Sequence, residues 1–90
     1  MARREKVTKV IDGDTFETAS RKNPVRLANV DAPEKGEPGA AKATDALRKM
    51  IQGEEVTIDT VARDSYGRSV ANVKVGGKSV NKAMKGKLID

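Results

Sequence analysis

The chain has no cysteine and no histidine among its 90 residues. These absences exclude disulfide bonds, thiolate nucleophiles, zinc sites of the usual kind and acid–base catalysis by histidine. Any chemistry at neutral pH must therefore use carboxylates, arginine, lysine or the only tyrosine, Tyr66. A metal site in such a chain is limited to oxygen ligands, which suit hard cations such as calcium.

Long apolar runs are also missing. No stretch approaches the roughly 20 apolar residues that a membrane-spanning helix needs, so we expect no membrane partner. Residues 1–6 are basic but precede no hydrophobic stretch, so we expect no signal peptide in this chain. The localisation stays open between the cytoplasm and a processed secreted form.

The chain is rich in charged residues. Charged residues make up 34% and hydrophobic residues 37% of the sequence, which predicts one folded domain, residues 1–90, rather than disorder. The formal net charge is +5. A basic domain is attracted to polyanions such as nucleic acid, although many small basic proteins bind nothing in particular.

Three strands are predicted in the first third of the chain. Residues 6–11, 15–20 and 25–30 are rich in β-forming side chains and are separated by turn signals, which predicts a meander. The first turn is Asp12-Gly13, a pair that readily adopts the positive φ typical of hairpins.

A helix is predicted from Ala40 to Gln52, because apolar side chains there recur at helical spacing. They are Ala40, Ala43, Leu47, Met50 and Ile51. Gly53 follows, where a helix end favours a residue with positive φ.

Two more strands are predicted at residues 55–59 and 69–75, with a polar loop from Arg63 to Gly67 between them and a short helix at residues 80–84. Three strands, a helix, two strands and a short helix are typical of a β-rich α+β fold, the five-stranded OB-fold barrel. Proteins with this fold commonly bind oligonucleotides.

Two acidic segments are candidates for a metal site. Asp12-Gly13-Asp14-Thr15 is either an ordinary turn or a source of a metal carboxylate from Asp14. The segment from Asp31 to Glu34 is either a solvated strand end or a site segment. In the second case Asp31 supplies a carboxylate, Ala32 its backbone carbonyl, and Glu34 a base that deprotonates or orients water.

Two arginines are candidates for phosphate binding. Arg26 lies in the middle of a predicted strand, so its side chain either reaches past the sheet edge to solvent or lies buried against an anion. Arg68 ends the segment Asp64-Ser65-Tyr66-Gly67-Arg68, which is either a plain turn or a second phosphate-binding loop. A guanidinium can hold a phosphate through two hydrogen bonds. Hydrolysis of a phosphodiester needs this combination of metal carboxylates, a base and cationic groups.

These segments together resemble the staphylococcal nuclease (thermonuclease) family, as a short member. The matching segments are Val10–Phe16, Val25–Glu34, Asp64–Arg68 and Val80–Met84. The resemblance covers nearly the whole chain and implies an OB-fold nuclease that uses Ca²⁺ to hydrolyse DNA and RNA, leaving 3′-phosphate ends.

The resemblance also implies a role for each candidate. Asp14, Asp31 and the Ala32 carbonyl would bind calcium, and Glu34 would act as the general base or position the water. The remaining roles are phosphate binding by Arg26 and Arg68, a place beside the nucleotide for Tyr66, and support of the metal ligands by Asp12.

Two departures from the family pattern affect the expectations. Position 32 is Ala where the best-known member has Thr, but a backbone carbonyl survives that change. The chain stops at Asp90, where well-known members continue into another helix and further tyrosines. Fewer aromatic side chains predict weaker substrate binding, and a thinner core predicts low stability or reliance on a partner chain. The oligomeric state stays open, and a dimer is compatible with the short C-terminus.

Two other functions stay open from the sequence. The domain is either an active calcium-dependent nuclease or an inert member of the fold that binds nucleic acid or protein. The presence of all five charged side chains that the chemistry would need most directly favours activity. They are Asp14, Arg26, Asp31, Glu34 and Arg68. A module that binds single strands without cutting them would need more aromatic side chains than Phe16 and Tyr66.

Overall fold

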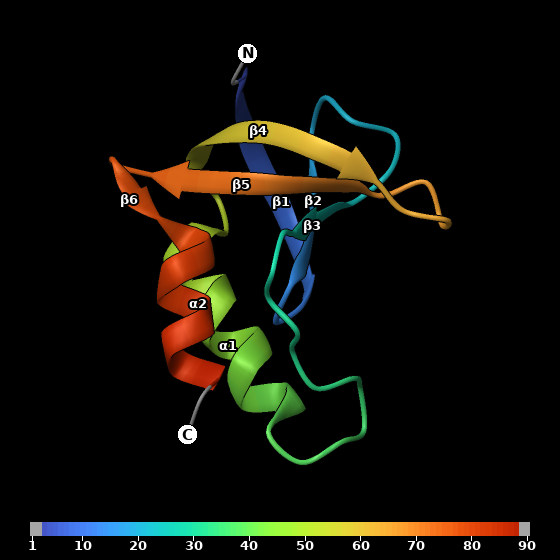
Figure 1. Cartoon of the computed structure of the whole chain (residues 1–90). Helices are drawn as coiled ribbons and strands as arrows, with labels where there is room; N and C mark the ends of the chain where they lie inside the picture. Colours follow the sequence, from blue (N-terminus) through green and yellow to red (C-terminus); the bar gives the residue numbers. More distant parts are fainter. Residues whose placement is uncertain (1–2, 89–90) are drawn as a thin grey trace.

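The computed structural model describes residues 3–88, which form six strands and two helices (Figure 1). The strands are β1 (Arg3–Asp12), β2 (Thr15–Thr18), β3 (Val25–Leu27), β4 (Glu55–Arg63), β5 (Ser69–Val75) and β6 (Lys78–Ser79), and the helices are α1 (Ala40–Ile51) and α2 (Val80–Leu88). The strand order is β3-β2-β1-β4-β5-β6, and a further pairing of β3 with β5 closes the first five strands into a ring. The predicted β-rich α+β class is confirmed, and the ring is consistent with an OB-fold.

The ring closes through one short parallel pairing. Strands β1, β2 and β3 are antiparallel neighbours, which confirms the predicted meander. Strand β3 then pairs in parallel with β5, through Val25 with Ser69, Arg26 with Val70 and Leu27 with Ala71. This pairing brings the beginning and the later part of the chain together.

Some predicted boundaries are wrong. The third strand ends at Leu27 rather than Val30, because Asn29 has a left-handed backbone (φ 61°) that an extended strand cannot contain. The fourth strand continues past Asp59 to Arg63, so Arg63 is not in a loop. This extension pairs with β5 beyond a register shift between Thr60 and Ala62.

The main helix is confirmed. Helix α1 ends at Ile51, buries Ala40, Ala43, Leu47 and Ile51, and is followed by Gly53 with the predicted positive φ, 82°. Met50 is only partly buried. Helix α2 continues beyond the predicted 80–84 to Leu88, while Asp90 lies outside the described residues.

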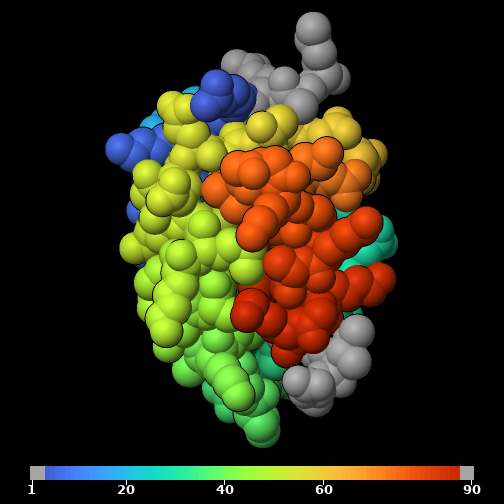
Figure 2. Space-filling view, turned by 90° about the vertical axis from the view of Figure 1, so that its left-hand side faces the viewer, coloured from blue at the N-terminus to red at the C-terminus, as the bar shows by residue number. Residues whose placement is uncertain are grey.

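The two helices lie side by side on one face of the molecule (Figure 2). Neither helix of the described chain combines the length and the apolar character needed to cross a bilayer.

The core lies inside the ring and under both helices. Its members are mostly aliphatic, with Phe16 as the one aromatic: Val7, Val10, Phe16, Val25, Leu27, Val30, Leu47, Ile51, Val56, Ile58, Ala71, Val73, Val80 and Met84. One polar side chain, Asn81, is buried beside them. Its amide donates to the carbonyls of Ala28 (2.9 Å) and Ala71 (3.0 Å), and its oxygen accepts from the Val73 N–H (2.8 Å). Asn81 therefore ties α2 to β5 and to the end of β3.

A buried ion pair outside the core joins β1 to the turn after β2. The Arg21 guanidinium lies 2.8 Å from the Glu5 carboxylate, and only 5% of the Glu5 side chain is exposed. Thr18 and Ser20 also donate to Glu5, and Arg21 reaches on to the Ser69 hydroxyl (3.0 Å). Burial opposes ionisation, but the hydrogen bonds from Ser20, Thr18 and Arg21 and the Arg21 charge lower the pKa of Glu5 below its ordinary value.

We expect Glu5→Gln to lower the free energy of unfolding by about 2 kcal/mol near neutral pH, because it leaves the half-buried Arg21 without a counter-charge. A lowered pKa stabilises the fold above the ordinary value of 4.5, and this contribution is lost as the pH falls through the lower folded-state pKa. The difference between wild type and Glu5→Gln should therefore shrink below pH 4.5. Denaturant unfolding across a pH series measures it.

Glu55→Gln is the matched control, since the Arg4–Glu55 pair has exposed fractions of 77% and 61%. Its loss should cost less than about 0.5 kcal/mol. Equal costs for the two variants at neutral pH would contradict the structural role of Glu5.

Candidate active site

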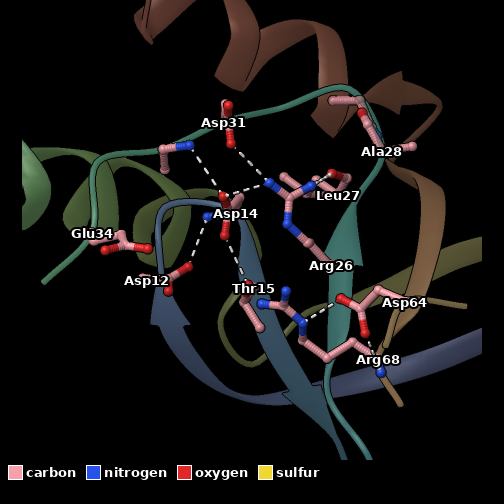
Figure 3. A network of polar contacts seen from close by, with 12 residues as sticks. Asp12, Asp14, Thr15, Arg26, Leu27, Ala28, Asp31, Glu34, Asp64 and Arg68 are labelled. Carbon is pink, nitrogen blue, oxygen red and sulfur yellow. Dashed lines mark hydrogen bonds and ion pairs between the residues drawn. The ribbon is translucent and has the colours of Figure 1, made fainter. Parts of the chain in front are cut away.

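A cavity of about 150 Å³ gathers seven of the eight candidate residues. It is lined by Asp12, Asp14, Arg26, Asp31, Ala32, Glu34 and Arg68, which come from the end of β1, the β1–β2 turn, β3, the segment after β3 and the β4–β5 hairpin. Figure 3 shows their polar side chains converging on one place. Tyr66 does not line this cavity.

Asp14 is the most enclosed of these carboxylates. One of its oxygens accepts from the Thr15 hydroxyl (2.8 Å), and the other from the Ala32 N–H (3.1 Å). Its own carbonyl accepts from the Leu27 N–H (2.8 Å). Asp14 thus fixes the β1–β2 turn against both β3 and the segment that follows β3.

Arg26 lies between two carboxylates. Its Nη2 is 3.3 Å from Asp14 Oδ2 and 3.0 Å from Asp31 Oδ1, while Nη1 donates to the Leu27 carbonyl (3.2 Å). The structure therefore supports the second of the two possibilities for Arg26, a half-buried side chain against anions. The Asp31 side chain is 99% exposed, so it can turn away from Arg26 without loss of packing.

Asp12 and Asp14 form a coupled pair of carboxyls. Asp12 Oδ1 accepts from the Asp14 N–H (3.1 Å). Burial, together with the neighbouring Asp14 carboxyl, raises the pKa of Asp12. Burial would also raise the pKa of Asp14, but hydrogen bonds from Asp12, Ala32 and Thr15 and the Arg26 charge outweigh it and lower that pKa. Asp14 is therefore the member of the pair that loses its proton at the lower pH.

Arg68 is held by Asp64 from its own hairpin. Asp64 accepts from Arg68 Nε (2.6 Å), from the Arg68 N–H (2.9 Å) and from the Tyr66 N–H (3.0 Å). Desolvation opposes the shift, but these hydrogen bonds lower the pKa of Asp64. The Tyr66 ring is 82% exposed and lies 5.4 Å from the Arg68 guanidinium carbon, so Tyr66 stands at the edge of the site.

The donor chemistry of the cavity fits a hard cation. Asp14, Asp31 and the Ala32 backbone offer oxygen atoms only, which is the set that calcium accepts. Within the part of the chain that the structure describes, no three acidic side chains already form a metal cage. The Arg26 guanidinium lies between the two aspartates instead, so a cation that binds both must displace it.

Comparison with known proteins gives the family. The sequence pattern described as "Staphylococcal nuclease homologue" matches residues 24–87. The chain belongs to the staphylococcal nuclease family.

Several relatives within this family carry nuclease names. A protein of Escherichia coli O157:H7 named "Uncharacterized endonuclease" is 38% identical over 82 residues, which cover 88% of this chain and 54% of the relative. A "Micrococcal nuclease" of Shigella flexneri is 33% identical over 72 residues, which cover 78% of this chain and 41% of the relative. A staphylococcal-like nuclease of Arabidopsis thaliana is 32% identical, over 84% of this chain and 24% of the relative. The chain spans about half the length of the first of these staphylococcal nuclease relatives.

Three residues that support the site were not predicted from the sequence. Thr15 hydrogen-bonds Asp14, Asp64 holds Arg68, and Asn81 holds the Ala28 carbonyl just before the segment that carries Asp31. Only Asn81 gave a usable signal, because a lone amide among the apolar positions of a helix suggests a specific buried partner.

The predicted turn at Gly13 is present, but the predicted reason for a glycine there is wrong. Gly13 does not have a positive φ. A Cβ at this position would lie 2.6 Å from the Ala43 Cβ and 2.8 Å from the Ala32 Cβ. Glycine is needed here because the turn packs closely against α1 and against the Ala32 segment.

Gly13→Ala should therefore lower the free energy of unfolding by about 1–3 kcal/mol, as overpacking does elsewhere. Gly86→Ala in α2 is the control, because no heavy atom lies within 4 Å of the added Cβ. It should be stabilising by about 0.5–1 kcal/mol, since alanine favours a helix over glycine. Thermal unfolding of both variants tests the contact, and equal melting temperatures would contradict it.

Proposed function

We propose that this chain is a calcium-dependent endonuclease that hydrolyses phosphodiester bonds of DNA or RNA. The observation that carries the proposal is the convergence of Arg26 and Arg68 with Asp14, Asp31 and Glu34 on one cavity of about 150 Å³. Membership of the staphylococcal nuclease family and the endonuclease and nuclease names of several relatives support it.

The arginines are suited to hold the scissile phosphate. Arg26 and Arg68 come from β3 and the end of the β4–β5 hairpin, and both guanidinium groups line the cavity. Each can donate two hydrogen bonds to a phosphate, and together they offset the charge that develops on its oxygens in the transition state. Asp64 keeps Arg68 in place, so Asp64 is a positioning residue in this proposal.

The carboxylates are suited to hold the cation. Asp14, Asp31 and the Ala32 carbonyl would be the protein ligands, supported by Asp12 behind Asp14. When bound, calcium supplies positive charge next to the phosphate oxygens. Arg26 would then leave the aspartates and be available to the substrate phosphate.

Glu34 is the candidate base. It lines the cavity and is otherwise exposed, so a water molecule can reach it. In the proposed step Glu34 accepts a proton from water, and the water oxygen bonds to phosphorus. The bond from phosphorus to the 5′-oxygen breaks, and this oxygen takes a proton from solvent. The products are a 3′-phosphate and a 5′-hydroxyl. The exposed Tyr66 ring offers a surface beside the nucleotide that follows or precedes the cut.

The first test is cleavage of single-stranded DNA and RNA with calcium and with EGTA. Cleavage should occur with calcium and stop with EGTA, because without a bound cation the carboxylates of Asp14 and Asp31 repel the substrate phosphate. A pure preparation that cuts neither nucleic acid at any calcium concentration would refute the nuclease and leave the inert binding module.

Glu34→Gln should lower kcat by about 10²–10⁴-fold, which is the usual contribution of a general base. Calcium-dependent binding of the substrate should change little, because Gln is neutral but has the same shape. Glu54→Gln provides the control, since Glu54 is exposed and does not line the cavity. Full activity in Glu34→Gln would remove Glu34 from the mechanism.

A further inference from the structure

The candidate cavity is too small for a nucleotide. Its volume is about 150 Å³, whereas sites that enclose small-molecule ligands usually measure about 300–1,000 Å³. The cavity can take a phosphate group, and the rest of a nucleic acid strand must lie on the surface around it.

Two larger hollows share walls with this cavity, and they differ in charge. One is lined by Asp31, Ala32, Pro33, Glu34, Glu37 and Pro38, which include three carboxylates and no basic side chain. The other has a volume of about 440 Å³ and is lined by Arg26, Asn29, Val30, Asp31 and Lys85. Two cations against one carboxylate give the second hollow a formal charge of +1, and the first has −3.

A phosphate next to the scissile one is repelled by the first hollow and attracted by the second. We propose that the hollow beside Arg26, with Asn29 and Lys85 in its walls, binds the neighbouring phosphate of the substrate strand, while Arg26 itself holds the scissile one. This inference rests on the proposed nuclease function, which it deepens by giving the strand a path away from the cavity.

Lys85 is well placed to donate to such a phosphate. It lies in α2 next to Met84, which is fully buried, so the helix is fixed while the Lys85 side chain stays exposed. None of the ion pairs among the described residues involves Lys85. Its ammonium group can therefore bind a phosphate without breaking an existing contact.

Asn29 forms another wall of the hollow. Its left-handed backbone, with φ 61°, lies between Ala28 and Val30, which are both buried. The Ala28 N–H donates to the Ala71 carbonyl (2.8 Å), and Asn81 holds the Ala28 carbonyl. The exposed Asn29 side chain therefore stands on a fixed segment and offers an amide N–H to an anion.

The hollow includes Asp31, which lies on the opposite side of Arg26 from Arg68 (Figure 3). Figure 3 shows Arg68 and Asp64 on one side of Arg26, and Asp31 with the helix beyond it on the other. A strand that enters beside Tyr66 thus passes over Arg68 and Arg26 and leaves along α2 past Lys85.

The test is binding of thymidine oligonucleotides of two and of five nucleotides to proteins that carry Glu34→Gln, with calcium present. The dinucleotide has one phosphate, which the cavity takes, so Lys85→Ala should leave its affinity unchanged. The pentanucleotide also reaches the hollow, and Lys85→Ala should weaken it by about fivefold, as expected for the loss of one contact to a charged group. The slope of log affinity against log salt should fall by about 0.7 for the longer strand.

Two further variants complete the design. Lys49→Ala removes an exposed lysine from α1 outside both hollows, and it should not change the affinity or the slope by as much. Asn29→Gly removes the amide but tolerates the left-handed backbone, so it should also weaken only the pentanucleotide.

The possible results separate the two proposals. Both proposals are supported if Lys85→Ala lowers the affinity for the longer strand alone and the wild-type protein cleaves nucleic acid. Equal effects of Lys85→Ala and Lys49→Ala, or equal losses on both oligonucleotides, would overturn the phosphate hollow while the nuclease stands. If the affinity falls for the longer strand alone but the wild-type protein cleaves nothing, the nuclease proposal is overturned and the hollow stands as part of a binding surface.

Discussion

The parallel pairing of β3 with β5 is the contact on which the candidate site depends. Three residue pairs join strands that are more than 40 positions apart, and they close the ring. Arg26 lies on β3, and Arg68 directly precedes β5, so this pairing brings the two guanidinium groups to one cavity. Asn81 secures the pairing from α2, because its side chain bonds the carbonyls of both Ala28 and Ala71. A buried amide with three satisfied bonds fixes one arrangement, since each bond left unmade would cost free energy.

Charge balance explains why so many ionisable groups can share one small space. Asp14 is mostly enclosed, and burial of an unpaired carboxylate would be costly. Hydrogen bonds from Thr15 and Ala32 and the charge of Arg26 remove that cost. Arg26 therefore stabilises the fold without a metal and is also one of the groups that a phosphate would attract. The Asp31 side chain is exposed, so its ion pair with Arg26 can break without disturbing the packing of the core.

The surface around the cavity is electrostatically uneven, and this unevenness gives the proposed substrate a direction. The net charge of the chain alone predicts attraction to nucleic acid but no path for it. The carboxylates that line the hollow beside Glu34 would repel a phosphate backbone. In the proposed path the backbone leaves the cavity on the other side, past Lys85 and Asn29. The few aromatic residues of the chain make such ionic contacts more important, because Tyr66 is the only aromatic side chain exposed to stack with a base.

The sequence by itself located most of the elements and fixed the chemical inventory of this protein. Hydrophobic periodicity is a local property, so it located α1, the meander and the alternating face of β5, and the absence of cysteine and histidine limited a metal site to oxygen ligands. Family resemblance supplied the candidate residues, and seven of the eight line one cavity. Only the tertiary structure decided what depends on contacts between distant residues. It gave the end of β3 at Leu27, the steric reason for Gly13, the Glu5–Arg21 pair and the place of Arg26 between two aspartates. No local pattern specifies these features, because each is set by which surfaces meet when the ring closes.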